Sequence, residues 1–193
     1  MSDTRSRKTQ LRSDLRRRRK NLSSAQQLAA AQALTRSIGE LPIWASAERI
    51  ALYLAADGEI DTLPLEKMAR NLDKLLFLPV ICADNSLGFA RWDAGDTLSN
   101  NRYDIPEPPG TAARCPASNL DIIFLPLVGW DLRGGRLGMG QGFYDRTLAG
   151  ISGPVLVGLA HDSQQVEDVP KESWDIAMDF IATDAALYRR QEN

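Results

Sequence analysis

Histidine is almost absent from this chain, and cysteine is scarce. His161 is the only histidine among 193 residues, and Cys82 and Cys115 are the only cysteines. A Ser-His-Asp or Cys-His catalytic arrangement would therefore depend on His161 alone, and no nucleophile motif lies near it. A zinc site of histidines and cysteines cannot be assembled, so any bound metal should be a hard cation held by carboxylates. Two distant cysteines without a CxxC spacing favour a reduced, cytoplasmic protein.

Long apolar segments are also missing. The sequence has no run of about 18 apolar residues, so no membrane-spanning helix is expected. The charged N-terminus lacks the apolar core of a secretory signal, which also favours the cytoplasm. The length and the 44% hydrophobic content suit one globular domain covering residues 1–193.

Charge is unevenly distributed, although the formal net charge is only −2. The first 20 residues hold nine basic and two acidic residues, whereas the remainder holds 14 basic and 23 acidic residues. A basic arm of this kind can bind nucleic acid, or it can reach back to an anionic ligand on its own domain. The acidic remainder argues against a broad RNA-binding surface.

Strands and helices alternate along the chain, which predicts an α/β protein with a mainly parallel sheet. Residues 5–20 lack Pro and Gly and predict a basic helix, and Ser23 or Ser24 can cap a second helix that ends near Gly39. Residues 95–118 carry four prolines and predict a surface excursion. The other expected elements are strands at 49–55, 74–81, 87–92 (solvent-facing or at an edge), 120–130, 154–160 and 179–183, and helices at 62–72 (capped by Thr62) and about 141–148.

The stretch RGGRLGMGQGFYDR directly follows the most apolar expected strand, 120–130. Ligands of parallel α/β sheets bind beyond the carboxyl ends of the strands. Glycine backbone there can direct N–H groups at phosphate oxygens, and Arg133, Arg136 and Arg146 can add charge-assisted hydrogen bonds. Asp145 could hold the magnesium ion that accompanies a nucleotide. The stretch matches neither the Walker pattern nor GxGxxG, so a purely structural turn is the alternative.

The segment RLGMGQGFYDR resembles the signature RLGxGGGxYDR of the 5-formyltetrahydrofolate cyclo-ligase family. The spacing of Lys8 and Arg12 and the segments ALYLAADGEIDT, FLPV, LDIIFLPLVGWD and ESWDIAMD resemble further family blocks in the same order. The resemblance therefore covers essentially the whole chain. Two positions depart from the pattern: Gln141 replaces a glycine, and Trp174 stands where a histidine often precedes the aspartate.

The resemblance implies a three-layer α/β fold and an ATP-dependent ring closure. In that reaction 5-formyltetrahydrofolate and ATP give 5,10-methenyltetrahydrofolate, ADP and phosphate. The formyl oxygen is phosphorylated, N10 attacks the activated carbon, and phosphate leaves. Such chemistry needs positioning and charge neutralisation more than a protein nucleophile, which agrees with the scarcity of histidine. The implied enzyme is a cytoplasmic monomer that uses ATP and Mg²⁺ and needs neither membrane nor nucleic acid.

The resemblance also implies site residues by matching position. Lys8 and Arg12 share one helix face and should contact ATP phosphates. Asp145 and Asp175 match the magnesium ligands. The nucleotide cradle would comprise Arg136, Leu137, Gly138, Met139, Gly140, Gln141, Gly142, Phe143 and Tyr144, with Tyr144 and Arg136 as the catalytic candidates. The substrate-binding candidates are Leu54, Glu59 and Tyr103.

Two groups of residues have no matching role. The run from Arg16 to Lys20 is interpreted as solvated or as making nonspecific contacts, and His161 either faces the cleft or is an ordinary loop histidine. The chemistry of the residues alone leaves two other functions open. One is a sugar-phosphate or CoA-type enzyme on a similar scaffold, and the other is an RNA-binding protein that uses the basic arm.

Overall fold

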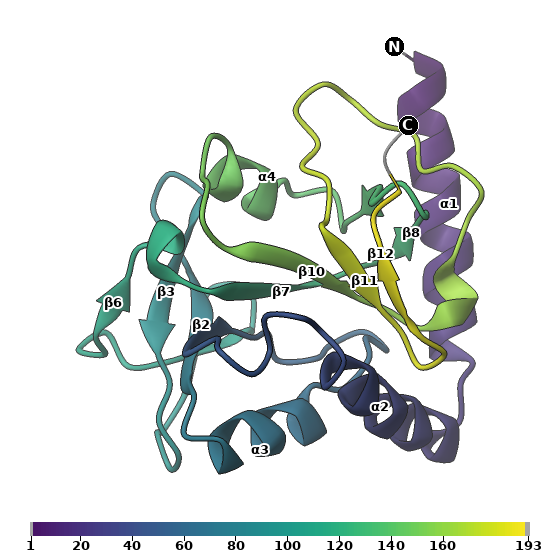
Figure 1. Cartoon of the computed structure of the whole chain (residues 1–193). Coiled ribbons are helices and arrows are strands. Elements are labelled where there is room, and N and C mark those ends of the chain that lie inside the picture. The colour runs from purple at the N-terminus through teal and green to yellow at the C-terminus, as the bar shows by residue number, and fades with distance from the viewer. Residues whose placement is uncertain (1, 192–193) are drawn as a thin grey trace.

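The structure is a computed structural model that describes residues 2–191 and is built around one large sheet (Figure 1). Within that range the sheet has eight strands, of which β1, β2, β7, β10 and β11 run parallel to one another and β3, β6 and β12 run antiparallel to their neighbours. The predicted mainly parallel α/β sheet is confirmed. In spatial order the strands are β12 (Leu187–Arg189), β11 (Phe180–Ala182), β10 (Val155–Leu159), β7 (Ile122–Pro126), β1 (Arg49–Ala51), β2 (Leu75–Ile81), β3 (Leu87–Arg91) and β6 (Arg114–Cys115).

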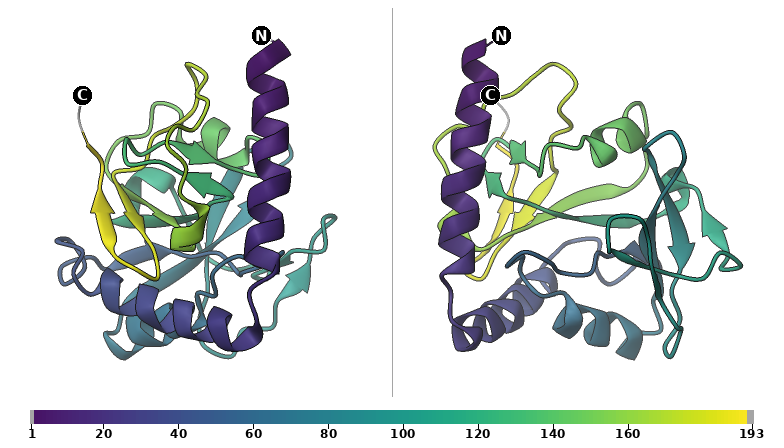
Figure 2. Two further views of the ribbon diagram at one scale, coloured as in Figure 1. Left: turned by 90° about the vertical axis from the view of Figure 1, so that its right-hand side faces the viewer. Right: turned by 180° about the vertical axis from the view of Figure 1, so that it is seen from behind.

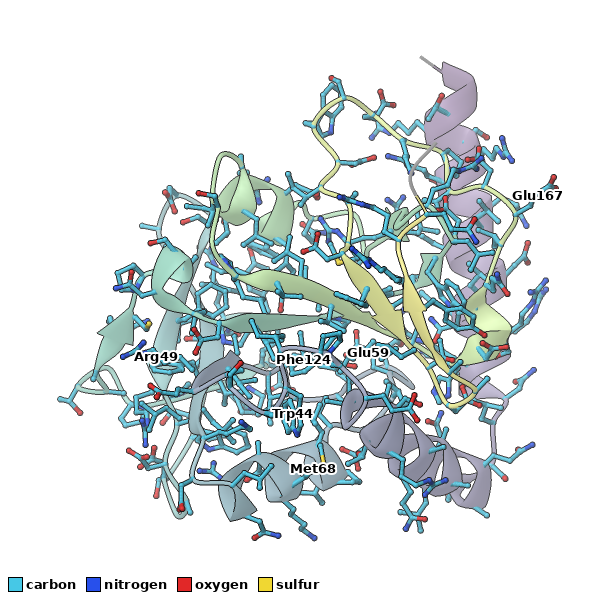
Figure 3. All side chains as sticks on the ribbon, viewed as in Figure 1. Trp44, Arg49, Glu59, Met68, Phe124 and Glu167 are labelled. Carbon is cyan, nitrogen blue, oxygen red and sulfur yellow. The ribbon has the colours of Figure 1, made fainter. Side chains whose placement is uncertain are left out.

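Helices cover both faces of the sheet and make three layers (Figure 1). The α2 helix (Ser24–Ile38) and the α3 helix (Leu63–Asn71) lie on one face, and α4 (Phe143–Leu148) lies on the other with the segments around it. The sheet has a hydrophobic core on each face, and alternate residues of β7 pack into one or the other. Phe124 packs against the core under α2 and α3, whereas Leu125 packs into the core on the side of α4. Trp44 meets Phe124 in the first core with ring centroids 6.5 Å apart (Figure 3).

The α1 helix (Ser2–Lys20) stands across the carboxyl ends of the parallel strands (Figures 1 and 2). Its buried Leu15 packs in a small cluster with Val128, Leu137 and Val169. The contact is close, because a Cβ atom at Gly129 would lie only 2.5 Å from Leu15 Cδ1. The helix therefore borders the sheet edge at which ligands of α/β proteins bind.

The cap at Ser23 is confirmed, whereas Thr62 occupies the N-cap position of α3 without a capping hydrogen bond from its side chain. Ser23 forms a capping box with Gln26, whose backbone N–H donates to the serine hydroxyl at 3.3 Å. The Thr62 hydroxyl instead donates to the Tyr53 carbonyl at 2.7 Å, while Asp61 accepts from the backbone N–H of Leu63. Thr62 therefore ties the start of α3 to the segment after β1.

Two strands are shorter than the sequence pattern predicts. The strand expected at 49–55 ends at Ala51, and the one expected at 120–130 divides into β7 and the short β8 (Gly129–Trp130). The division is stabilised by the buried Gln164, whose amide donates to the carbonyls of Leu127 and Val128, at 2.8 Å each. Both shortened strands leave backbone free at their carboxyl ends for irregular segments.

The expectation for 87–92 is also wrong. The β3 strand is not at an edge, because β6 pairs with it on the far side and Phe89 is buried. Residues 95–118 thus include a strand of the main sheet, besides the small hairpin of β4 (Ser99–Asn100) and β5 (Pro106–Glu107). No helix among the described residues is long and apolar enough to cross a membrane.

Candidate active site

The glycine-rich stretch divides into two parts with different roles. Its first part is the turn of a hairpin between β8 and β9 (Arg136–Leu137). The buried Asp131 carboxylate holds this turn, accepting from the backbone N–H groups of Arg133 (2.9 Å) and Gly135 (2.8 Å). Arg133 itself forms an ion pair with Asp168 on an exposed loop. The first two glycines thus shape a structural turn.

The second part, residues 138–142, is an open loop before α4. Gly140 has φ +94° and Gly142 has φ +69°, both in the left-handed region that favours glycine. Arg12 of α1 packs on this loop and donates from Nε to the Gly138 carbonyl at 2.8 Å. A Cβ atom at Gly140 would lie 3.3 Å from the Arg12 guanidinium carbon. The loop and the basic helix therefore form one surface, although they are far apart in the sequence.

Arg136 connects this loop to a distant segment of the chain. Its guanidinium is largely buried and forms an ion pair with Asp145 in the first turn of α4. The same carboxylate accepts from the backbone N–H of Ile176 at 3.2 Å, and Arg136 Nε donates to the Ile176 carbonyl at 3.4 Å. Residues 136–145 are thus fixed against residues 175–176.

The neighbouring Asp175 faces α1. Lys8 Nζ lies 2.6 Å from its carboxylate, which also accepts from the backbone N–H of Glu172 at 2.9 Å. Burial lowers the pKa of the Arg12 guanidinium, and the negative charge of Asp175 opposes that shift. The structure therefore brings Lys8, Arg12, Asp145 and Asp175 around the glycine loop. No cluster of three or more His, Cys, Asp or Glu side chains able to hold a metal occurs in the described part of the chain.

Glu59 lies in the segment after β1, at the same sheet edge (Figure 3). Its carboxylate accepts from the backbone N–H of Ala56 at 3.0 Å and lies 3.9 Å from the Arg19 guanidinium. Burial raises the pKa of Glu59, while the Ala56 hydrogen bond and Arg19 oppose the rise. Leu54, in the same segment, packs partly buried against the core under α2 and α3.

Tyr144 lies between this segment and the glycine loop. Its ring packs in the core on the α4 side, with the Arg136 guanidinium 6.0 Å from the ring centroid. Burial raises the pKa of the phenol, the nearby Glu59 carboxylate raises it further, and Arg136 opposes both. Tyr144 is therefore protonated near neutral pH and can donate a hydrogen bond to a ligand.

Comparison with known proteins shows the family of this chain. Residues 4–184 match the 5-formyltetrahydrofolate cyclo-ligase family. The chain belongs to this family. It is 39% identical over 174 residues to a 5-formyltetrahydrofolate cyclo-ligase of Haemophilus influenzae, covering 88% of this chain and 93% of the relative. The cyclo-ligase of Escherichia coli is 36% identical over 179 residues, covering 90% and 98%.

A solved structure shows the same fold. The 5,10-methenyltetrahydrofolate synthetase of Aquifex aeolicus aligns with a TM-score of 0.84 at 30% identity, covering 96% of this chain and 94% of that one. The three-layer fold expected from the cyclo-ligase resemblance is confirmed.

The remaining cyclo-ligase positions lie in and around the glycine loop. Leu137 is buried beneath it against α1, whereas Met139 is 47% exposed. Gln141 accepts a hydrogen bond at its carbonyl from Arg146, and Phe143 begins α4. Tyr103 is half exposed and meets the Phe143 ring edge-on, with centroids 6.0 Å apart. Trp174, the second departure from the family pattern, is 64% exposed next to Asp175.

The solvated interpretation of Arg16 to Lys20 is wrong for three of its five residues. Arg16, Arg19 and Lys20 all form ion pairs with Asp57, which follows β1, although Lys20 stays exposed, as do Arg17 and Arg18. Sequence reasoning missed this cluster because a run of basic residues does not reveal which of them face the protein. The helical period was the available signal, since Arg12, Arg16 and Arg19 recur at intervals of four and three residues.

His161 lies at the carboxyl end of β10, before the 3-10 turn Asp162–Gln164. It is buried, with 2% of its surface exposed, and its backbone N–H donates to the Gln164 side chain at 2.8 Å. Burial lowers its pKa, and the carboxylate of Asp184 opposes that shift. His161 is thus a buried residue of the turn after β10.

Proposed function

We propose that this chain converts 5-formyltetrahydrofolate and ATP into 5,10-methenyltetrahydrofolate, ADP and phosphate. The observation that carries the proposal is the convergence of Lys8, Arg12 and the Gly138–Gly142 loop beside Asp145 and Asp175 at one sheet edge. Membership of the cyclo-ligase family and the activity for which its relatives are named support the same reaction.

Lys8, Arg12 and Arg136 would hold the ATP phosphates together with the backbone N–H groups of the glycine loop. Charge-assisted hydrogen bonds from these cations would neutralise the transferring phosphoryl group and align it with the formyl oxygen. N10 of the folate then attacks the activated carbon, and phosphate leaves with the former formyl oxygen. Leu137 and Phe143 would support the loop, while Met139 and Gln141 would contribute backbone contacts.

The donor set fits a magnesium ion that enters with ATP. Asp145 and Asp175 offer two carboxylates joined through the Ile176 backbone, and Mg²⁺ is commonly bound by one or two carboxylates plus substrate phosphates. When bound, the ion would neutralise charge on the phosphate oxygens. Lys8 and Arg136, which pair with these aspartates, would supply additional positive charge to the same phosphates.

The folate would bind against the segment after β1. The Glu59 carboxylate can accept hydrogen bonds from the paired N–H donors of a pterin ring, and Leu54 would line the apolar part of that site. Tyr144 would donate its hydroxyl proton in a hydrogen bond near the transferring group, which its raised pKa supports. Tyr103, at the exposed rim on Phe143, would contact the bound substrates.

The other proposed properties follow from the same placement. We propose that the enzyme acts as a monomer, because α1 reaches the glycine loop of its own chain, where Arg12 Nε donates to the Gly138 carbonyl. The free thiols of Cys82 and Cys115 support the cytoplasm as its compartment. An RNA-binding role is disfavoured, because three residues of the basic run are engaged by Asp57.

The test is to incubate the purified protein with ATP, Mg²⁺ and 5-formyltetrahydrofolate and to follow methenyl formation by absorbance. ADP and phosphate are measured in parallel and should each equal the methenyl product. Arg12→Ala should slow product formation, whereas Arg18→Ala, on the exposed face of the same helix, should not. Absence of product above the no-enzyme control contradicts the proposal, as does ATP hydrolysis without methenyl formation.

A further inference from the structure

We propose that Arg19 is a positioning residue of the folate site, which fixes the segment after β1, and with it Glu59, against the end of β7. This inference rests on the proposed function. Arg19 lies on α1, the helix that also carries Lys8 and Arg12. It would therefore join the folate half of the site to the nucleotide half through one rigid element.

The Arg19 side chain is fully buried, with 0% of its surface exposed. A buried cation is costly unless its charge and its N–H groups find partners. Nε donates to the Asp57 carbonyl at 2.9 Å, Nη2 to the Asp57 carboxylate at 2.9 Å, and Nη1 to the Leu127 carbonyl at 3.2 Å. One guanidinium thus bridges the segment after β1 and the end of β7, where the chain turns toward the glycine loop.

The segment held by Arg19 adopts an unusual backbone. Asp57 has φ +53° and Gly58 has φ +76°, so two consecutive residues are left-handed, and the first is not glycine. A Cβ atom at Gly58 would lie 3.4 Å from the Cγ atoms of Arg19 and Lys20, so the segment lies directly on α1. Such a conformation persists when its surroundings stabilise it, and the Asp57 contacts with α1 do so.

Glu59 follows immediately and depends on this arrangement for both position and charge. Arg19 Nη2 lies 3.9 Å from its carboxylate. The other charged or titratable groups that face Glu59 are Asp57 on its own segment, Tyr53 after β1 and Tyr144 on α4. Burial raises the pKa of both tyrosines, whereas Arg16, Lys20 and Arg19 lower that of Asp57. Of these three cations, Arg19 is the one for which the described residues also show an ion pair with Glu59.

The experiment compares Arg19→Met and Arg19→Lys with Arg18→Met, an exposed neighbour on the same helix. In Arg19→Met the Asp57 carboxylate keeps Arg16 and Lys20, and the Leu127 carbonyl keeps Gln164, so folding is expected. We expect the KM for 5-formyltetrahydrofolate to rise about tenfold or more, because small displacements of a positioning group have large effects. The KM for ATP should change little. Arg19→Lys should show a smaller rise in the KM for 5-formyltetrahydrofolate than Arg19→Met, and Arg18→Met should match the parent.

A pH profile separates positioning from general loss of structure. The ionised Glu59 is the acceptor, so kcat/KM for the folate should fall as the pH drops through the Glu59 pKa. Removal of Arg19 raises that pKa further, so the acidic limb of the Arg19→Met profile should move to higher pH. Arg18→Met should leave the limb unchanged.

An inactive parent enzyme refutes the proposed function, and this inference with it. An active parent whose Arg19 variants keep the parental folate KM and pH profile refutes the inference alone. Equal losses for ATP and folate also overturn it, because they indicate a structural role only. If circular dichroism shows that Arg19→Met does not fold, Arg19→Lys is compared with Arg18→Met instead. A folate KM of Arg19→Lys equal to that of the parent then also refutes the inference.

Discussion

Replacing Gly140 with alanine tests the nucleotide cradle most directly. The added Cβ atom meets two obstacles. Gly140 has φ +94°, a conformation that L side chains rarely adopt, and the new atom would lie 3.3 Å, 3.4 Å and 3.5 Å from Cζ, Nη2 and Nε of Arg12. The Arg12 guanidinium must therefore move by a few tenths of an ångström, away from its hydrogen bond to the Gly138 carbonyl.

The two obstacles have different consequences. Left-handed backbone strain lowers the free energy of unfolding by about 1–2 kcal/mol. Displacement of Arg12 affects a charge-assisted hydrogen bond, and such bonds contribute about 1.5–3 kcal/mol when fully formed. If Arg12 holds an ATP phosphate, complete loss of its contact would weaken ATP binding by roughly tenfold to a hundredfold, and partial displacement by less.

Gly95 supplies a matched control. Its φ is +88°, close to that of Gly140, yet a Cβ atom there has nothing within 4 Å. Gly95→Ala should therefore show the backbone strain without the contact with Arg12. Urea denaturation measures the loss of stability in both variants, and calorimetric titration measures the Kd for ATP. We expect similar stability losses, with weaker ATP binding in Gly140→Ala only.

Two results would refute this reasoning. If folded Gly140→Ala binds ATP like the parent, residues 138–142 are a structural connection and not a phosphate cradle. If Gly95→Ala loses ATP affinity to the same extent, the effect arises from general destabilisation, and the contact with Arg12 is irrelevant.

Three further predictions concern charged residues. Replacing Lys8 and Arg12 together with alanine should weaken ATP binding by about tenfold or more per residue while leaving folate binding nearly intact, as titration with each substrate would reveal. Asp145→Asn and Asp175→Asn should each raise the Mg²⁺ concentration that gives half-maximal rate by on the order of tenfold, since an amide oxygen is a weaker ligand for a hard cation. A variant that needs the same Mg²⁺ concentration as the parent would show that its residue is not a ligand. The cationic partners of Asp57 lower the pKa of its carboxyl group. The ionised carboxylate therefore stabilises the fold above about pH 4, and this stabilisation is lost as the pH falls toward the folded-state pKa. The urea midpoint of Asp57→Asn should consequently depend less on acid pH than that of the parent.

Sequence patterns located most of the elements but not all of their ends. The Ser23 cap and the β2 and β10 strands were predictable because capping and buried apolar runs are local signals. The ends of β1 and β7 were not, because the side chains that stabilise the departing backbone, Thr62 and Gln164, come from other segments. The edge assignment of 87–92 failed because its partner β6 follows a long connection with no periodic signal.

The residues of the candidate site were likewise predictable from the sequence, but their arrangement in space was not. The sequence alone indicated the family, the glycine loop, and the pairs Lys8 with Arg12 and Asp145 with Asp175, because these depend on residue type and order. Whether those residues meet was decided by the fold, which joins positions 8 and 175 in one ion pair.

Only the tertiary structure decides which face of the basic α1 helix is turned toward the protein, because the helical period shows which residues share a face but not where that face points. Arg17 and Arg19 have the same side chain two positions apart, yet one faces solvent and the other is fully buried on Asp57. The sequence determines that a helix here is basic, because composition and helix propensity are local properties. The rotation of that helix about its axis is set by Leu15 packing against Val128, Leu137 and Val169, and this packing selects the arginine that is turned inward.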